Sequence, residues 1–94
     1  MTTLTKAATD VIAERERQKA VEGWDDAHDD AYSAYQLADA AACYALGTMS
    51  PGGHRKWPWD SRWWKPRGYR RNLVKAAALL MAEIERIDRA EIKQ

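Results

Sequence analysis

Apolar residues recur at helical spacing along three stretches of the chain, and polar segments separate them. The pattern predicts helices over about 3–21, 29–46 and 69–92, because residues three and four apart share one face of a helix. Gly23 and Gly47 follow the first two stretches, where glycine commonly ends a helix. The sequence therefore predicts an all-α protein, a three-helix antiparallel bundle with all 94 residues in a single helical domain.

The first predicted helix has an apolar face that includes Leu4, Ala8 and Val11. The charged run Glu14-Arg15-Glu16-Arg17-Gln18 falls outside this face. We therefore expect these five polar side chains to remain in contact with water.

The third predicted helix has the most regular pattern, with apolar residues separated alternately by four and three positions. Such a seam is typical of a coiled coil. It covers only about two and a half heptads, so we expect it to pack inside the bundle. Two short helices and one longer helix form only a thin core, which favours a homo-oligomer. The seam residues are Leu73, Ala77, Leu80, Ile84 and Ile87.

The segment 47–68 is predicted to be a long loop. It holds four of the five tryptophans between Trp57 and Trp64, together with Pro58 and Pro66. Proline is disfavoured inside helices, and a loop this long in a small domain is commonly functional. The tryptophans either fill the core of a protein that has no Phe, or present flat aromatic faces to a ligand.

Basic residues follow the tryptophans and continue into the start of the third predicted helix. Indole rings can stack on a base, and basic side chains near a helix N-terminus can bind phosphates. The alternative is that these residues neutralise acidic groups within the protein. On the first interpretation the ligand is a small anionic nucleotide, bound by Trp59, Trp63, Trp64, Lys65, Arg67, Tyr69, Arg70, Arg71 and Lys75.

Charge is divided between two segments although the formal net charge is only +1. The segment 22–39 carries acidic residues and no Lys or Arg, whereas 54–75 carries many basic residues and one acid, Asp60. The two segments can pair within the fold, pair between copies, or bind different partners. The only cysteine, Cys43, excludes an internal disulfide and is predicted to be a buried thiol.

His28, Asp29 and Asp30 are the candidate metal ligands, because carboxylates and an imidazole can hold Mg²⁺ or Mn²⁺. The alternative is that Asp25 or Asp26 caps a helix and that Asp29 and Asp30 lie in its first turn, where the helix dipole favours anions. Apart from a possible Mg²⁺, the sequence predicts no cofactor.

Chemistry of other kinds has little support in the sequence. Glu85 and Asp88 share a helix face, but they alternate with Arg86 and Arg89 as in an ordinary ion-paired surface. Neither a glycine-rich phosphate loop nor a nucleophile motif is present. We therefore predict no catalytic residue.

Several motifs together resemble a family of small proteins encoded by phages and prophages of proteobacteria. The resemblance covers most of residues 14–89 and implies a phage-related role in a bacterial cytoplasm, without a specific activity. The motifs are Glu14-Arg15-Glu16-Arg17-Gln18, Glu22-Gly23-Trp24, His28-Asp29-Asp30, Leu37-Ala38, Ala41-Ala42-Cys43-Tyr44-Ala45, Trp57-Pro58-Trp59, Trp63-Trp64-Lys65-Pro66, Arg70-Arg71-Asn72-Leu73-Val74-Lys75-Ala76 and Ala82-Glu83-Ile84-Glu85-Arg86-Ile87-Asp88-Arg89.

A weaker similarity is to MazG-like all-α nucleotide pyrophosphohydrolases, in which carboxylates on facing helices hold Mg²⁺. Where the phage family often has a second His and Gly-Glu-Leu, this chain has Tyr32 and Tyr35-Gln36-Leu37. The difference removes two groups that could bind metal or take part in catalysis.

Three functions remain open. The first is capture of an anionic nucleotide by a counter-defence protein that sequesters a signalling molecule. The second is inhibition of a host protein, gripped by the tryptophan loop. The third is a divergent Mg²⁺-dependent pyrophosphohydrolase. The N-terminus has no apolar signal region and no apolar run can span a bilayer, so we expect a cytoplasmic protein that does not bind membranes. The carboxylates of the third alternative are Asp29, Asp30, Glu85 and Asp88.

Overall fold

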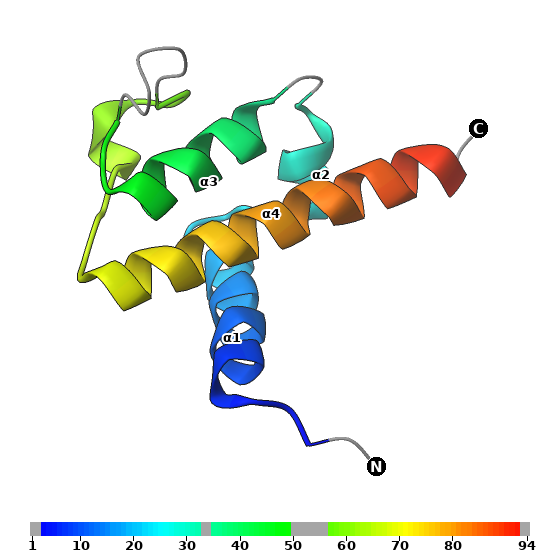
Figure 1. Cartoon of the computed structure of the whole chain (residues 1–94). Helices are drawn as coiled ribbons and strands as arrows, with labels where there is room; N and C mark the ends of the chain where they lie inside the picture. The colour runs from blue at the N-terminus through cyan, green and yellow to red at the C-terminus, as the bar shows by residue number, and fades with distance from the viewer. Residues whose placement is uncertain (1–2, 33–34, 50–56, 93–94) are drawn as a thin grey trace.

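The computed structural model describes residues 3–32, 35–49 and 57–92, and within them the regular structure is entirely helical (Figure 1). The predicted all-α class is confirmed. No helix in these three ranges is both long enough and apolar enough to cross a membrane. The elements in chain order are α1 (Lys6–Ala20), α2 (Asp26–Asp30), α3 (Gln36–Leu46), the short 3-10 helix η2 (Ser61–Trp63) and α4 (Tyr69–Ile92).

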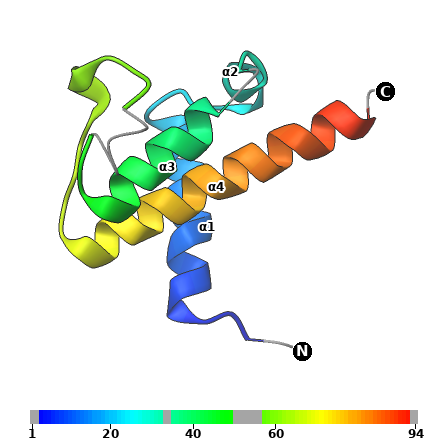
Figure 2. The ribbon, with the colours of Figure 1, turned by 45° about the horizontal axis from the view of Figure 1, so that its top comes forward.

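The long helix α4 is the element against which the others pack. Helix α3 runs beside its N-terminal half in the opposite direction, and α2 lies against its C-terminal half (Figures 1 and 2). Helix α1 crosses α4 steeply in both views instead of running alongside it. The arrangement therefore differs from the predicted three-helix antiparallel bundle.

Helix α1 is shorter than the predicted 3–21. The side-chain oxygen of Thr5 accepts a hydrogen bond from the Ala8 N–H at 3.1 Å, so the helix begins only after this cap. It ends at Ala20, and Gly23 adopts a φ of 77° that L-residues seldom take. That turn reverses the chain and brings Trp24 back against the end of α1, where its N–H donates to the Gln18 carbonyl.

The single helix predicted over 29–46 is wrong, because the structure has two helices there. The carboxylate of Asp25 accepts from the His28 N–H at 2.9 Å and begins α2 early, as a cap of the predicted kind. Helix α2 ends at Asp30, whose carboxylate binds Arg89 in the C-terminal half of α4, whereas α3 lies along the N-terminal half. One straight helix cannot reach both places. Gly47, with φ of 70°, ends α3 as predicted.

The core lies between α3 and α4 and contains many small side chains. Alanines on both helices allow their backbones to approach closely, and tryptophans fill the remaining space. Cys43 is fully buried, as predicted, and burial raises the pKa of its thiol. The core residues are Trp24, Leu37, Ala40, Ala41, Cys43, Tyr44, Trp57, Ala76, Leu79 and Ala82.

Two expectations about buried faces are wrong. On α1, three residues of the charged run are buried, because they form a polar network with α2 and α4: Glu14, Arg15 and Gln18. On α4, the seam of alternating spacing does not enter the core, because the opposite, alanine-rich face packs on α3.

Two leucines on α3 provide a test of this packing. Leu37 is 1% exposed and Leu46 is 63% exposed. Leu37→Ala should lower the free energy of unfolding by about 2–5 kcal/mol, because it removes buried methyl groups and leaves a cavity. Leu46→Ala should change it by less than about 0.5 kcal/mol. Urea unfolding followed by circular dichroism measures both, and equal effects would contradict the placement of α3.

Candidate ligand-binding site

Part of the tryptophan loop belongs to the core. Trp57 is only 7% exposed and meets the rings of Tyr44 and Trp59 edge-on, at centroid distances of 5.5 and 5.2 Å. Trp64 lies against both Tyr44 and Trp57, at 4.7 and 5.1 Å. For Trp57 and Trp64, packing is therefore the main role.

The loop is fixed to α3 by the hydroxyl of Tyr44. This oxygen accepts a hydrogen bond from the Lys65 N–H at 3.1 Å and donates one to the Trp63 carbonyl at 3.4 Å. The Asp60 carboxylate caps η2 by accepting from the Arg62 N–H. The segment 57–65 is thus held in one conformation by its contacts.

Trp59 and Trp63 line a cavity of about 350 Å³ beside this packed layer. The ring of Trp59 lies 5.2 Å from that of Trp24 and 5.7 Å from that of Tyr32. We call this cavity the aromatic pocket. It is lined by Glu22, Trp24, His28, Tyr32, Trp59, Asp60 and Trp63. Most of its walls are flat rings, and two carboxylates supply acceptors.

A second cavity, of about 380 Å³, lies between the end of α1 and the start of α4. Five of its lining side chains are cationic and only one is acidic. We call it the basic pocket. Its lining residues are Arg17, Val21, Glu22, Lys65, Arg67, Arg71 and Lys75.

Lys75 is the most buried cation of the basic pocket, and its ammonium donates to the Lys65 carbonyl at 2.6 Å. Burial lowers the pKa of Lys75, and the positive charges of Arg67, Arg17 and Arg71 lower it further, against the opposing effect of Glu14. The protein therefore holds these cations close together at an electrostatic cost. A bound anion would reduce that cost.

Glu22 lies between the two pockets and lines both. Its carboxylate accepts from the Lys65 ammonium at 3.1 Å and from Arg17 at 3.3 Å. The same Lys65 ammonium lies 5.7 Å from the ring centroid of Trp63. The aromatic and basic pockets are therefore neighbours, and one ion pair separates them.

Glu14 lies behind the basic pocket and keeps part of its wall in place. Its buried carboxylate accepts from Arg17 at 2.8 Å, from Gln18 at 3.1 Å and from Arg71. Burial alone would raise the pKa of Glu14, but the hydrogen bonds and charge of Arg17 and the charge of Arg71 outweigh it and hold the pKa below its ordinary value. Glu14 therefore remains ionised and orients both arginines.

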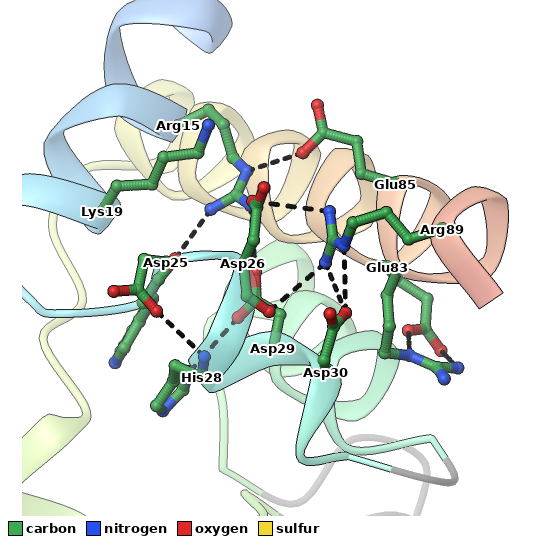
Figure 3. Close-up of polar contacts among 12 residues, drawn as sticks. Arg15, Lys19, Asp25, Asp26, His28, Asp29, Asp30, Glu83, Glu85 and Arg89 are labelled. Carbon is green, nitrogen blue, oxygen red and sulfur yellow. Dashed lines mark hydrogen bonds and ion pairs between the residues drawn. The ribbon is translucent and has the colours of Figure 1, made fainter. Parts of the chain in front are cut away.

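Arg15, the next residue of α1, contacts α2, α4 and the backbone of Trp24 (Figure 3). Its guanidinium donates to Asp29 of α2 at 2.9 Å, to Glu85 of α4 at 3.1 Å and to the Trp24 carbonyl at 2.9 Å. Asp29 has no exposed surface, and burial raises its pKa despite the opposing effects of His28 and Arg15. This network fixes the Trp24 wall of the aromatic pocket.

The three candidate metal ligands do not converge on one point. His28 and Asp29 are in contact, with 3.2 Å between Nδ1 and Oδ1. Asp30 turns towards α4, where its carboxylate accepts from Arg89 at 2.7 Å (Figure 3). Within the described ranges no group of three or more His, Cys, Asp or Glu side chains is arranged to hold a metal ion.

The carboxylates expected in a pyrophosphohydrolase site do come together in part. Asp29 and Glu85 approach each other from α2 and α4, but the Arg15 guanidinium binds both. The guanidinium of Arg15 thus lies between the two carboxylates, where a pyrophosphohydrolase would hold Mg²⁺. Asp88 is exposed on α4.

The structure brings together four of the predicted ligand-binding residues, Lys65, Arg67, Arg71 and Lys75, in the basic pocket. Three predicted residues do not line either pocket: Trp64 packs against Tyr44 and Trp57, Tyr69 is largely exposed, and Arg70 pairs with Asp10 at 2.9 Å. Sequence reasoning missed four wall residues that lie far from the loop along the chain, because no local pattern marks them: Arg17, Glu22, Trp24 and Tyr32. It also missed Asp60, which lies within the loop itself.

The acidic and basic segments touch through the Lys65–Glu22 ion pair. Other acidic residues of 22–39 pair elsewhere: Asp29 with Arg15, and Asp30 with Arg89. These two arginines lie outside the basic segment 54–75, of which 54–56 are not among the described residues. Among the described residues of the basic segment, Lys65, Arg70 and Arg71 pair with Glu22, Asp10 and Glu14, so internal neutralisation accounts for these three cations.

No protein-family model matches the chain, and comparisons with curated proteins and with solved structures give no match either. The resemblance to small phage proteins stays a prediction. The function must therefore be argued from the two pockets.

Removal of Arg15 should destabilise the protein strongly. Arg15→Met keeps much of the side-chain volume but leaves Asp29 buried without its cation. Loss of one partner of a buried ion pair costs about 3–5 kcal/mol. Lys19→Met on the same helix removes only an exposed pair with Glu16, so it should cost less than about 1 kcal/mol. Chemical unfolding compares the two, and a mild Arg15→Met phenotype would contradict this role.

Acid should weaken the fold in part through Glu14. Because its pKa in the folded protein is below the ordinary value, its stabilising contribution is present above about pH 4.5 and is lost as the pH falls through the folded pKa. The stability difference between wild type and Glu14→Gln should therefore shrink below about pH 4.5. Urea unfolding at a series of pH values measures it. The exposed Glu16→Gln variant is the control, and a difference that does not depend on pH would contradict the assignment.

Proposed function

We propose that the protein binds a small anionic nucleotide, with the base in the aromatic pocket and the phosphates in the basic pocket. The observation that carries the proposal is that a ring-lined cavity and a cation-lined cavity adjoin at Glu22 and Lys65. A nucleotide is a ligand with the same two parts, a flat ring and an anionic group, joined by a short linker.

The aromatic pocket suits a base for two reasons. Trp63 and Trp59 offer ring faces, and stacking of a base on an aromatic side chain contributes about 1–3 kcal/mol. Glu22 and Asp60 can accept hydrogen bonds from the amino and imino groups at the edge of a base. We assign Trp63 as the main stacking residue, because Trp64 is occupied by Tyr44 and Trp57.

The basic pocket suits phosphates because its cations come from two separate helices and from the loop between them. Arg17 belongs to α1, Lys65 and Arg67 to the loop, and Arg71 and Lys75 to α4. Charge-assisted hydrogen bonds from arginine to phosphate are among the strongest that proteins form. A phosphate group would also relieve the repulsion that lowers the pKa of Lys75.

We propose a binding role and not a catalytic one, since Asp29 and Glu85 are already neutralised by Arg15. Together with the resemblance to small phage-encoded proteins, this favours capture of a signalling nucleotide as a counter-defence function. The alternative of a host-protein inhibitor requires an exposed tryptophan loop, whereas Trp57 and Trp64 are engaged in packing.

Two arginines on either side of the start of α4, Arg67 in the loop and Arg70 in the first turn, offer a matched test. Arg67 lines the basic pocket, whereas Arg70 faces Asp10 on α1 and does not line it. Arg67→Ala should weaken nucleotide binding by about tenfold, which is the effect of losing a charge-assisted hydrogen bond. Arg70→Ala should change the affinity by less than about twofold. Titration of tryptophan fluorescence with mono-, di-, tri- and cyclic nucleotides gives the dissociation constants.

A variant of the aromatic pocket can be tested in the same titration. Trp63→Leu should weaken binding of nucleotides more than binding of inorganic pyrophosphate, because pyrophosphate has no base to stack. Recovery of intact nucleotide after binding would support capture, and recovery of a cleaved product would identify an enzyme. Equal effects of Arg67→Ala and Arg70→Ala, or no response to any nucleotide, would overturn the proposal.

A further inference from the structure

Helix α4 has a second apolar face that lies outside the core, and α1 borders this face near Leu73. Leu80, Ile84 and Ile87 are 46%, 59% and 43% exposed, and Leu73 at the start of the same line is also exposed. These residues lie on the side of α4 opposite Lys75, Leu79 and Ala82, which are buried. Contiguous exposed apolar patches are uncommon on monomeric proteins and mark interaction sites. We call this line, together with Ala77, the α4 seam.

We propose that the α4 seam binds the same seam of a second copy of the protein, with the two helices antiparallel. The two ends of the seam lie at equal distances from its central residue, Leu80. Leu73 and Ile87 each lie seven residues from Leu80, so a two-fold axis beside Leu80 pairs each with the other. Ala77 lies three residues before Leu80 and Ile84 four residues after it, so Ala77 is within one residue of the level of the partner's Ile84, and its small side chain leaves room for the larger one. Alternating spacings of four and three are those of helices that pack along such a seam.

Charge favours the antiparallel orientation over the parallel one. The first two turns of α4 carry Arg70, Arg71 and Lys75 and no acid, whereas the last three turns carry Glu83, Glu85, Asp88 and Glu91 among two arginines. An antiparallel pair places Arg70 beside the partner's Asp88 and Glu91. A parallel pair would place Arg70 beside the partner's Arg70. Opposed helix dipoles also favour the antiparallel pair.

A groove beside the seam completes the surface. It has a volume of about 270 Å³, lies between α1 and α4 and is lined by Ala7, Val11, Arg70, Leu73 and Val74. The antiparallel arrangement brings the partner's Ile87 and Ile92 towards this groove. In Figures 1 and 2 the C-terminal turns of α4 extend past α2, which leaves them accessible to a partner.

The mass of the protein without nucleotide tests the proposal independently of ligand binding. Sedimentation equilibrium of the wild type in the micromolar range should give twice the chain mass of 10.7 kDa. Leu80→Glu places two carboxylates on the symmetry axis and should weaken the dimer by at least about 100-fold, to a monomer with an unchanged circular dichroism spectrum. Leu46→Glu, on an exposed leucine outside the seam, should leave the dimer intact. A monomeric wild type, or a dimer that Leu80→Glu does not affect, would overturn the proposal.

Disulfide cross-linking tests the orientation. Wild-type protein is the blank, because its cysteine, Cys43, is buried. Leu80→Cys should form a cross-linked dimer on mild oxidation, since the axis places both copies of this residue together. Leu73→Cys alone should not, whereas the double variant Leu73→Cys/Ile87→Cys should. Efficient cross-linking of Leu73→Cys alone would show a parallel pair and overturn the antiparallel arrangement.

Discussion

The guanidinium of Arg15 lies inside the protein where α1, α2 and α4 meet, and the positions of these helices depend on it. Its donors fix Asp29 of α2, Glu85 of α4 and the backbone of Trp24. A buried guanidinium cannot lose its proton, so every structure that buries it must supply acceptors at these places. This requirement explains why α2 separates from α3 and turns towards the far end of α4. It also explains why α1 crosses α4 with charged residues at the contact.

The same helix organises the candidate site on its other side. Glu14 directs Arg17 and Arg71 into the basic pocket, while Arg15 directs Trp24 to the wall of the aromatic pocket. Two consecutive residues of α1 thus support two adjoining cavities. The cations are fixed before any ligand arrives, so binding an anion requires little further ordering of side chains. This arrangement suits a protein whose task is to hold a ligand.

Alanine shapes the remainder of the molecule. The alanine-rich faces of α3 and α4 let the two helices approach closely, and tryptophans from a loop supply the bulk that the helices lack. Because the alanine-rich face of α4 packs against α3, the larger aliphatic residues of α4 remain exposed on its other side. A helix with apolar residues on both faces can pack within one chain and against another. The small core and the exposed seam both follow from the alanine-rich faces of α3 and α4.

The sequence by itself determined the helical class, the bounds of α4 and the end of α3 at Gly47, and it narrowed the cap of α2 to Asp25 or Asp26. It also determined the chemistry of the segment that contributes Lys65, Arg67, Arg71 and Lys75 to one pocket. These features follow from local periodicity, from cap preferences and from residues close together in the chain. Only the tertiary structure decided that Arg15 and Glu14 are buried, that Trp64 packs while Trp63 lines a cavity, and that Arg17 joins the basic pocket. From sequence alone, a charged residue on a helix is predicted to be exposed. Its burial requires a partner from a distant segment to neutralise the charge, and no local pattern specifies that partner.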